Sequence, residues 1–119
     1  MNNKKLGNNF EREFVELLAS KGYWVHFMTP DKNGKQPCDI IACKDGTPFL
    51  IDCKTSAKKV FPFSRLEDNQ VCAFEKFGST GNSKRFVAIK FEDKIYFVHY
   101  LLLKNLKKVE LTDEFLFKE

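Results

Sequence analysis

Residues 37–54 read PCDIIACKDGTPFLIDCK and predict a β-hairpin. Two apolar runs, residues 38–43 and 48–54, flank Asp45-Gly46, which is a strong signal for a two-residue type I′ turn. A turn of that length pairs Lys44 with Thr47. The same register places Asp39 directly opposite Asp52, so the hairpin brings two acids together.

The hairpin places charges of the same sign side by side. Strand alternation puts Lys54 on the face of Asp39 and Asp52, and the side chains of paired residues lie about 5 Å apart. One interpretation is a surface face with three solvated charges. The apolar residues around them, Ile40-Ile41 and Leu50-Ile51, favour the other, in which a cation holds the carboxylates together. Hard oxygen ligands of this kind suit Mg²⁺ or Mn²⁺.

Residues 10–21 predict an amphipathic helix. The apolar residues Phe10, Phe14, Leu17 and Leu18 follow helical spacing, Asn8 or Asn9 is a candidate cap, and Gly22 a candidate end. At 100° per residue Glu11 falls inside the apolar arc. Glu11 is therefore either a first-turn carboxylate that the helix dipole favours or an acid that points toward a site on the sheet.

A second helix contains a polar residue on its apolar face. Ser64 and Glu67 have the spacing of a capping box, and Gly78 is expected to close the helix. Gln70 lies within the arc of apolar side chains. It is interpreted either as a satisfied core amide or as a hydrogen-bond donor of an active site, and the sequence leaves both open.

The remaining elements complete an α/β fold. Strands are expected at residues 23–28, 85–91 and 95–99, and a short apolar helix at 100–106. Residues 55–63 are interpreted as a basic connection, and the chain after residue 106 as a weakly defined tail. The order α-β-β-β-α-β-β-α predicts a mixed five-stranded sheet flanked by helices.

Composition narrows the class of protein. A chain of 119 residues fits a single domain, residues 1–119. A hydrophobic fraction of 43% with 30% charged residues excludes a disordered chain and a membrane protein. The basic start lacks the apolar segment of a signal peptide, so we expect a cytoplasmic protein. The four cysteines form no Cys-x-x-Cys pair and are interpreted as small apolar residues.

The net charge of +4 is mild, but the basic residues cluster. They are expected either to be solvated or to contact the phosphates of a nucleic acid. His26 and His99 are interpreted as structural. The candidate phosphate contacts are Lys32, Lys35, Lys58, Lys59, Lys84 and Arg85.

Pro37-Cys38-Asp39 followed by Asp52-Cys53-Lys54 resembles the PD-(D/E)xK signature of the restriction-endonuclease-like nucleases. Gly7 and Glu11 resemble the Gly-x-x-x-Glu start of Holliday-junction resolvases, both archaeal and bacterial RecU-type. Further likenesses are Lys54-Thr55-Ser56 to the archaeal enzymes, and Phe61-Pro62-Phe63, Asn69-Gln70 and Ile95-Tyr96-Phe97 to the RecU type. The chain departs from the RecU type in its short segment 29–37 and in Asn69, where those enzymes tend to have His.

The resemblance implies a restriction-endonuclease-like core and a Mg²⁺-dependent endonuclease that resolves four-way DNA junctions in recombination and repair. Glu11, Asp39 and Asp52, with the Cys53 carbonyl, would hold Mg²⁺, with Mn²⁺ able to substitute, while Lys54 and Gln70 would act on the water or phosphate. Two symmetric cuts imply a homodimer. The alternatives are another nuclease of the superfamily, of phage or restriction type, and a non-catalytic DNA-binding module on a degenerate nuclease fold. Retention of the three acids and Lys54 argues against degeneration.

Overall fold

The computed structural model describes residues 3–28 and 38–118, with side chains from Asn9 onward. The helices are α1 (Asn3–Ser20), α2 (Asp68–Ser79) and α3 (Tyr100–Leu106), and short 3₁₀ turns occupy Phe63–Arg65 and Asp113–Phe115. The strands are β1 (Trp24–Phe27), β2 (Ile40–Lys44), β3 (Thr47–Ser56), β4 (Val60–Pro62), β5 (Arg85–Phe91), β6 (Lys94–His99) and β7 (Lys108–Glu110).

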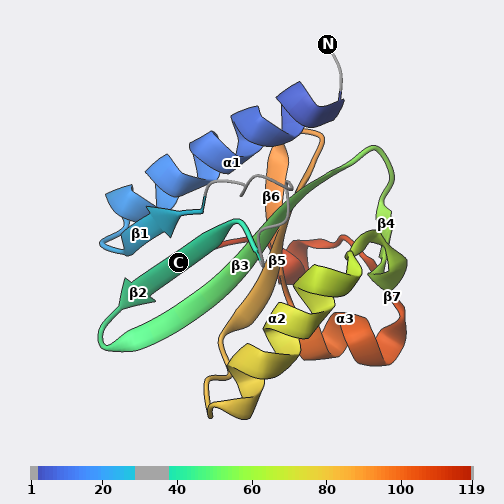
Figure 1. The fold of residues 1–119 in the computed structure, drawn as a ribbon. Coiled ribbons are helices and arrows are strands. Elements are labelled where there is room, and N and C mark those ends of the chain that lie inside the picture. Colours follow the sequence, from blue (N-terminus) through green and yellow to red (C-terminus); the bar gives the residue numbers. More distant parts are fainter. Residues whose placement is uncertain (1–2, 29–37, 119) are drawn as a thin grey trace.

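The five-stranded sheet has the order β1-β2-β3-β5-β6 (Figure 1). Strands β3 and β5 run parallel and the other neighbours antiparallel, so the predicted mixed five-stranded sheet is confirmed. The crossover from β3 to β5 carries α2, as a parallel connection requires.

The predicted hairpin register is confirmed. Lys44 pairs with Thr47 and Ile40 with Ile51. Asp45 and Gly46 have φ of 52° and 76°, the left-handed values that a type I′ turn needs. Strand β2 begins at Ile40, so Asp39 lies one residue before the strand, level with Asp52 on the same register.

Helices cover both faces of the sheet (Figure 1). One face packs on α1 through Phe10, Phe14 and Leu18. The other packs on α2 and α3 through Phe74 and Tyr100. Strand alternation divides the side chains of β3 between these two cores: Leu50 belongs to the core of α2 and α3, and Ile51 and Cys53 to that of α1.

The predicted helix boundaries are partly wrong. Helix α1 begins at Asn3, so neither Asn8 nor Asn9 caps it. An Asn inside a helix costs well under 1 kcal/mol, about 0.7 at most, which is too little to stop the helix. Helix α2 begins at Asp68, because Phe63–Arg65 form a 3₁₀ turn and Leu66 is extended. It also continues one residue past Gly78.

Residues 55–63 and the chain after residue 106 were expected to be irregular, and both expectations are wrong. Strand β4 lies within the expected basic connection and pairs with β7 of the expected tail. Phe61 and Val109 anchor this second sheet in the core. Further on, Phe117 packs edge-on against Phe14, with ring centroids 5.1 Å apart. Across residues 3–28 and 38–118, the helices are too short or too polar to cross a bilayer.

Candidate functional site

Asp52 is the centre of the candidate site. Its side chain has no exposed surface, although it is an acid in the middle of the sheet. Gln70 of α2 donates from Nε2 to Oδ1 over 3.1 Å. The second oxygen, Oδ2, accepts no hydrogen bond from the described residues. It lies 3.0 Å from the Lys54 ammonium, with which it forms an ion pair.

Asp39 is held beside Asp52 by the backbone of β3. Its Oδ2 accepts a hydrogen bond from the Cys53 amide over 2.8 Å, and its side chain is almost fully buried. The predicted meeting of the two acids on adjoining strands is therefore present, and the peptide between Asp52 and Lys54 fixes it.

Glu11 reaches the same acids from α1. Burial raises its pKa from 4.5 to about 7, and the charge and hydrogen bonding of Asp39 add to the rise. Burial likewise raises the pKa of Asp52, with a further contribution from Asp39, while Lys54 opposes it. The charge of Lys54 thus opposes the rise at Glu11 and at Asp52 without cancelling it, and the site favours an additional positive charge or a proton.

Gln70 connects the site to the start of α2. Its Oε1 accepts from the Glu67 amide over 2.9 Å, which closes the N-terminus of the helix, and also from Lys54 Nζ over 3.1 Å. The capping pair is therefore Glu67 with Gln70, one turn later than the Ser64 pair that the sequence predicts. Two interpretations of Gln70 were open, a core amide and a hydrogen-bond donor at the site. The structure places its amide against Asp52, as the second interpretation expects.

In the part of the chain that the structure describes, no three His, Cys, Asp or Glu side chains are already gathered as a metal-binding group. The Lys54 ammonium occupies the place next to Asp52 where a cation would be favourable. The acids are thus assembled by the backbone but their oxygens do not surround a common point.

The predicted phosphate contacts divide into three groups. Lys58, Lys59 and Lys84 are exposed. Lys32 and Lys35 lie outside the described residues. Arg85 corrects the prediction: its guanidinium is buried, donates to the Phe74 carbonyl over 3.2 Å and lies over the Tyr100 ring. It holds α2 on the sheet and is not available to a phosphate.

The histidines and cysteines follow most expectations. His99 caps α3, accepting from the Leu101 amide, and contacts the Ser83 carbonyl. The four cysteines are free, and Cys38 and Cys53 are buried beside the acids. His26 differs, because it is exposed on β1, where its ring stacks on Trp24. This aromatic pair was not predicted from the sequence. The two rings lie two residues apart on a strand, and that spacing alone indicates that they share one face.

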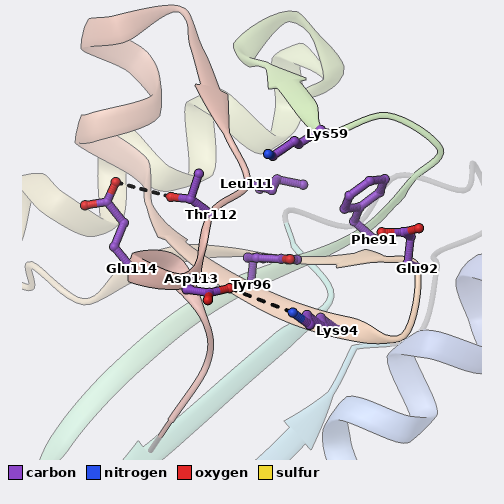
Figure 2. Close-up of a pocket in the computed structure, with 9 residues that line it drawn as sticks. All are labelled: Lys59, Phe91, Glu92, Lys94, Tyr96, Leu111, Thr112, Asp113 and Glu114. Carbon is purple, nitrogen blue, oxygen red and sulfur yellow. Dashed lines mark hydrogen bonds and ion pairs between the residues drawn. The ribbon is translucent and has the colours of Figure 1, made fainter.

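A wide depression of about 730 Å³ lies away from the acids, near the turn between β5 and β6 (Figure 2). Its lining mixes both signs of charge, and Lys94 pairs with Asp113 over 3.8 Å. Lys59 lies at its rim and pairs with Glu110. The depression contains none of the predicted catalytic residues, so the candidate site is the acid cluster.

Comparison with known proteins identifies the family. Residues 2–114 match the family model of the archaeal Holliday junction resolvase Hjc. The chain belongs to the archaeal Holliday junction resolvase family. The sequence resembles both archaeal and bacterial RecU-type resolvases, and the family model that matches is the archaeal one.

Named relatives agree with this family. The chain is 32% identical to the crossover junction endodeoxyribonuclease Hjc of Methanocaldococcus jannaschii, over 91% of this chain and 76% of the relative. It is 29% identical to the crossover junction endodeoxyribonuclease Hje of Sulfolobus acidocaldarius, over 92% and 78%. The Hjc structure of Archaeoglobus fulgidus superposes with a TM-score of 0.69 at 22% identity, covering 87% and 88% of the two chains. This last likeness confirms the fold of the resolvase family.

Proposed function

We propose that this chain is a metal-dependent endonuclease that cleaves four-way DNA junctions. The observation that carries the proposal is the fully buried Asp52, held by Lys54 and Gln70 beside Asp39 and Glu11, in a member of the archaeal resolvase family. The named relatives are crossover junction endodeoxyribonucleases, and the three acids lie within residues 2–114, which match the family model.

The acids fit a hard divalent cation. Asp52 Oδ2 is buried, with the Lys54 ammonium 3.0 Å away, and burial, with a further contribution from the charge of Asp39, raises the pKa of Glu11 and of Asp52. Glu11, Asp39, Asp52 and the Cys53 carbonyl would hold Mg²⁺, and Mn²⁺ would substitute. When bound, the ion polarises the scissile phosphate and lowers the pKa of a water. Binding requires the Lys54 ammonium to move from its place beside Asp52.

The side chains around the ion then have separate roles. Lys54, once displaced from Asp52, can orient the attacking water or stabilise charge that develops on the phosphorane. Gln70 is a positioning residue, because its amide fixes one Asp52 oxygen and leaves the other turned toward Lys54. The backbone amide of Cys53 fixes Asp39 in the same way. Hydrogen bonds thus orient Asp39 and Asp52, and the proposed reaction needs no covalent intermediate.

We also propose that the enzyme works as a homodimer in the cytoplasm. A four-way junction needs two symmetric cuts, and a two-fold dimer supplies two sites. Helix α3 carries exposed leucines suited to a contact between copies: Leu101, Leu102 and Leu106 are 40%, 38% and 56% exposed. A monomer mass in equilibrium sedimentation at micromolar concentration, with and without junction, would contradict the dimer.

The test is cleavage of labelled four-way junction, duplex and single strand in parallel, in Mg²⁺ and in EDTA. We expect Mg²⁺-dependent paired cuts near the branch point of the junction, and little cleavage of the other two. Equal cleavage of duplex and junction would indicate a nuclease of a different specificity. Cleavage that persists in EDTA would contradict the role of the acids.

A further inference from the structure

The sheet face that carries Asp52 extends beyond its helical cover. Helices α2 and α3 pack over β3, β5 and β6. In Figure 1 strands β1 and β2 project past α2 on the side away from α3. Among the described helices none packs on this face of β1.

Two aromatic rings stand on this uncovered face. Trp24 pairs with Cys43 and His26 with Ile41, and Ile41 pairs in turn with Leu50 on the side of α2. Strand alternation then puts Trp24 and His26 on the face of Leu50 and Asp52. Their rings are stacked, with centroids 6.2 Å apart and planes at 11°, and Trp24 is 62% exposed.

The register places the rings close to the acids. The Met28 amide donates to the Asp39 carbonyl, so Met28, Asp39 and Asp52 lie on one row of the sheet. His26 is two residues from that row and two strands from Asp52. At about 3.4 Å per residue and 4.8 Å per strand, the Cα atoms of His26 and Asp52 are roughly 12 Å apart. Trp24 lies two residues further along β1, so by the same spacings its Cα atom is roughly 17 Å from that of Asp52. These distances correspond to about three to five base steps of a DNA strand, at about 3.4 Å each.

We propose that Trp24 and His26 form a stacking platform for an unstacked nucleobase next to the branch point of the DNA substrate. This inference rests on the proposed function. A flat indole accepts the face of any base, so it adds affinity without sequence preference. In an intact duplex the neighbouring bases already cover both faces of each base. A base freed at a branch can use the platform, which makes the ring pair a device for selecting branched DNA.

The chain allows a direct test, because Trp24 is its one tryptophan. Intrinsic fluorescence of the wild-type protein is titrated in EDTA, which prevents cleavage, with a four-way junction and with a duplex of equal length. We expect saturable quenching by the junction and markedly less by the duplex at equal occupancy. Binding of the junction without any change of tryptophan emission would overturn the platform.

A mutant cycle identifies the base. Trp24→Ala should weaken junction binding by about 5- to 150-fold, the range for loss of one stacked base, while Trp24→Phe should retain most of the affinity. Abasic nucleotides are placed one at a time beside the branch point. At the stacked position, the abasic junction and Trp24→Ala should together weaken binding no more than either alone. Thermal melting confirms that each variant is folded.

Other outcomes separate the platform from the proposed function. If Trp24→Ala binds the junction within about twofold of wild type while wild type cleaves it, the platform is wrong and the nuclease stands. If wild type cleaves no branched DNA but the junction quenches Trp24, the platform stands and the proposed activity falls. If Trp24→Ala converts a dimer into a monomer in sedimentation without DNA, the ring pair belongs to an interface between copies and the platform is overturned.

Discussion

The most deeply buried acid among the described residues, Asp52, is central to the proposed chemistry of this protein. An unpaired charge in a protein interior costs several kcal/mol, so an acid there needs partners on each oxygen. Asp52 has Gln70 on one oxygen and the Lys54 ammonium near the other, while burial and the charge of Asp39 both disfavour its ionised form. Burying these acids side by side destabilises the folded protein when no cation is bound, and a bound cation would offset that cost.

The raised pKa of Glu11 predicts how stability depends on pH without metal. Between about 4.5 and 7 the folded protein retains a proton on Glu11 that the unfolded chain has lost, so stability falls as pH rises through that window. We expect the melting temperature in EDTA to be lower at pH 7.5 than at pH 5. Glu11→Gln should flatten part of this dependence, since Asp52 contributes in the same direction. The matched control, Glu16→Gln, changes an acid of the same helix that lies outside the acid cluster, and it should behave as wild type.

Two substitutions at Gln70 separate its structural and catalytic contributions. Gln70→Glu keeps an oxygen for the Glu67 amide and Lys54, but it replaces the donor to Asp52 with a further carboxyl group. It should remain folded and cleave about 100- to 1,000-fold more slowly, the range for a lost preorganised donor. Gln70→Leu also loses the helix cap, so its melting temperature should fall as well. Cleavage by folded Gln70→Glu at the wild-type rate would make Gln70 a capping residue only.

At this scale the sequence allows part of the site to be predicted. The opposition of Asp39 and Asp52 follows from the two-residue turn at Asp45-Gly46, because turn length determines register. The role of Arg85 does not follow, because its partners Phe74 and Tyr100 lie on two helices distant in sequence. Local charge pattern groups Arg85 with the solvated lysine before it, and only tertiary packing separates them.

At the scale of elements, α2 is the part that joins the fold to the site. Its first turn supplies Gln70, and Arg85 holds its second half through the Phe74 carbonyl. Gly78 allows close approach, because a Cβ there would overlap the Arg85 guanidinium. The sequence suggests Gly78 as a helix end, whereas its lack of a side chain makes room for Arg85.

A double-mutant cycle tests this contact. Gly78→Ala should displace the Arg85 guanidinium and lower the free energy of unfolding by about 1 kcal/mol, because the lost buried hydrogen bond outweighs the gain in helix propensity. With Arg85→Lys, whose side chain is shorter, the same Gly78→Ala should stabilise by up to about 1 kcal/mol. Chemical denaturation of the four proteins measures the coupling. Equal effects of Gly78→Ala in both backgrounds would show that the two residues do not interact.

Short elements were the least predictable. The three-residue strands β4 and β7 pair across almost fifty residues, and each has one buried anchor, Phe61 and Val109. So few residues give no periodicity to detect. Helix α1 was predictable from the period of its apolar residues, and the five strands of the main sheet from their apolar runs and the turn residues between them.

At the scale of the whole molecule, binding is expected to depend on exposed lysines rather than on base readout. Lys58 and Lys59 are exposed, and the pairing of Lys59 with Glu110 over 3.3 Å is a weak surface contact. Charge reversal at both should weaken junction binding and reduce the slope of log affinity against log salt by up to about 2, because each phosphate that a lysine neutralises adds roughly 0.9 to that slope. An unchanged slope would place these lysines away from the DNA. Reversal of Lys76, which is exposed on α2, is the control for net charge.

Junction cleavage is proposed to depend on Asp39 and Asp52, the two acids that the hairpin brings together. The substitution Asp52→Asn tests this most directly. The matched control is Asp45→Asn, the same chemical change in the turn of the same hairpin, where the left-handed backbone suits Asn. Single-turnover cleavage of a four-way junction in Mg²⁺ is measured for both variants and wild type, with binding measured in EDTA. We predict that Asp52→Asn stays folded, binds the junction and cleaves it several orders of magnitude more slowly, while Asp45→Asn matches wild type. Wild-type cleavage by Asp52→Asn would contradict the site.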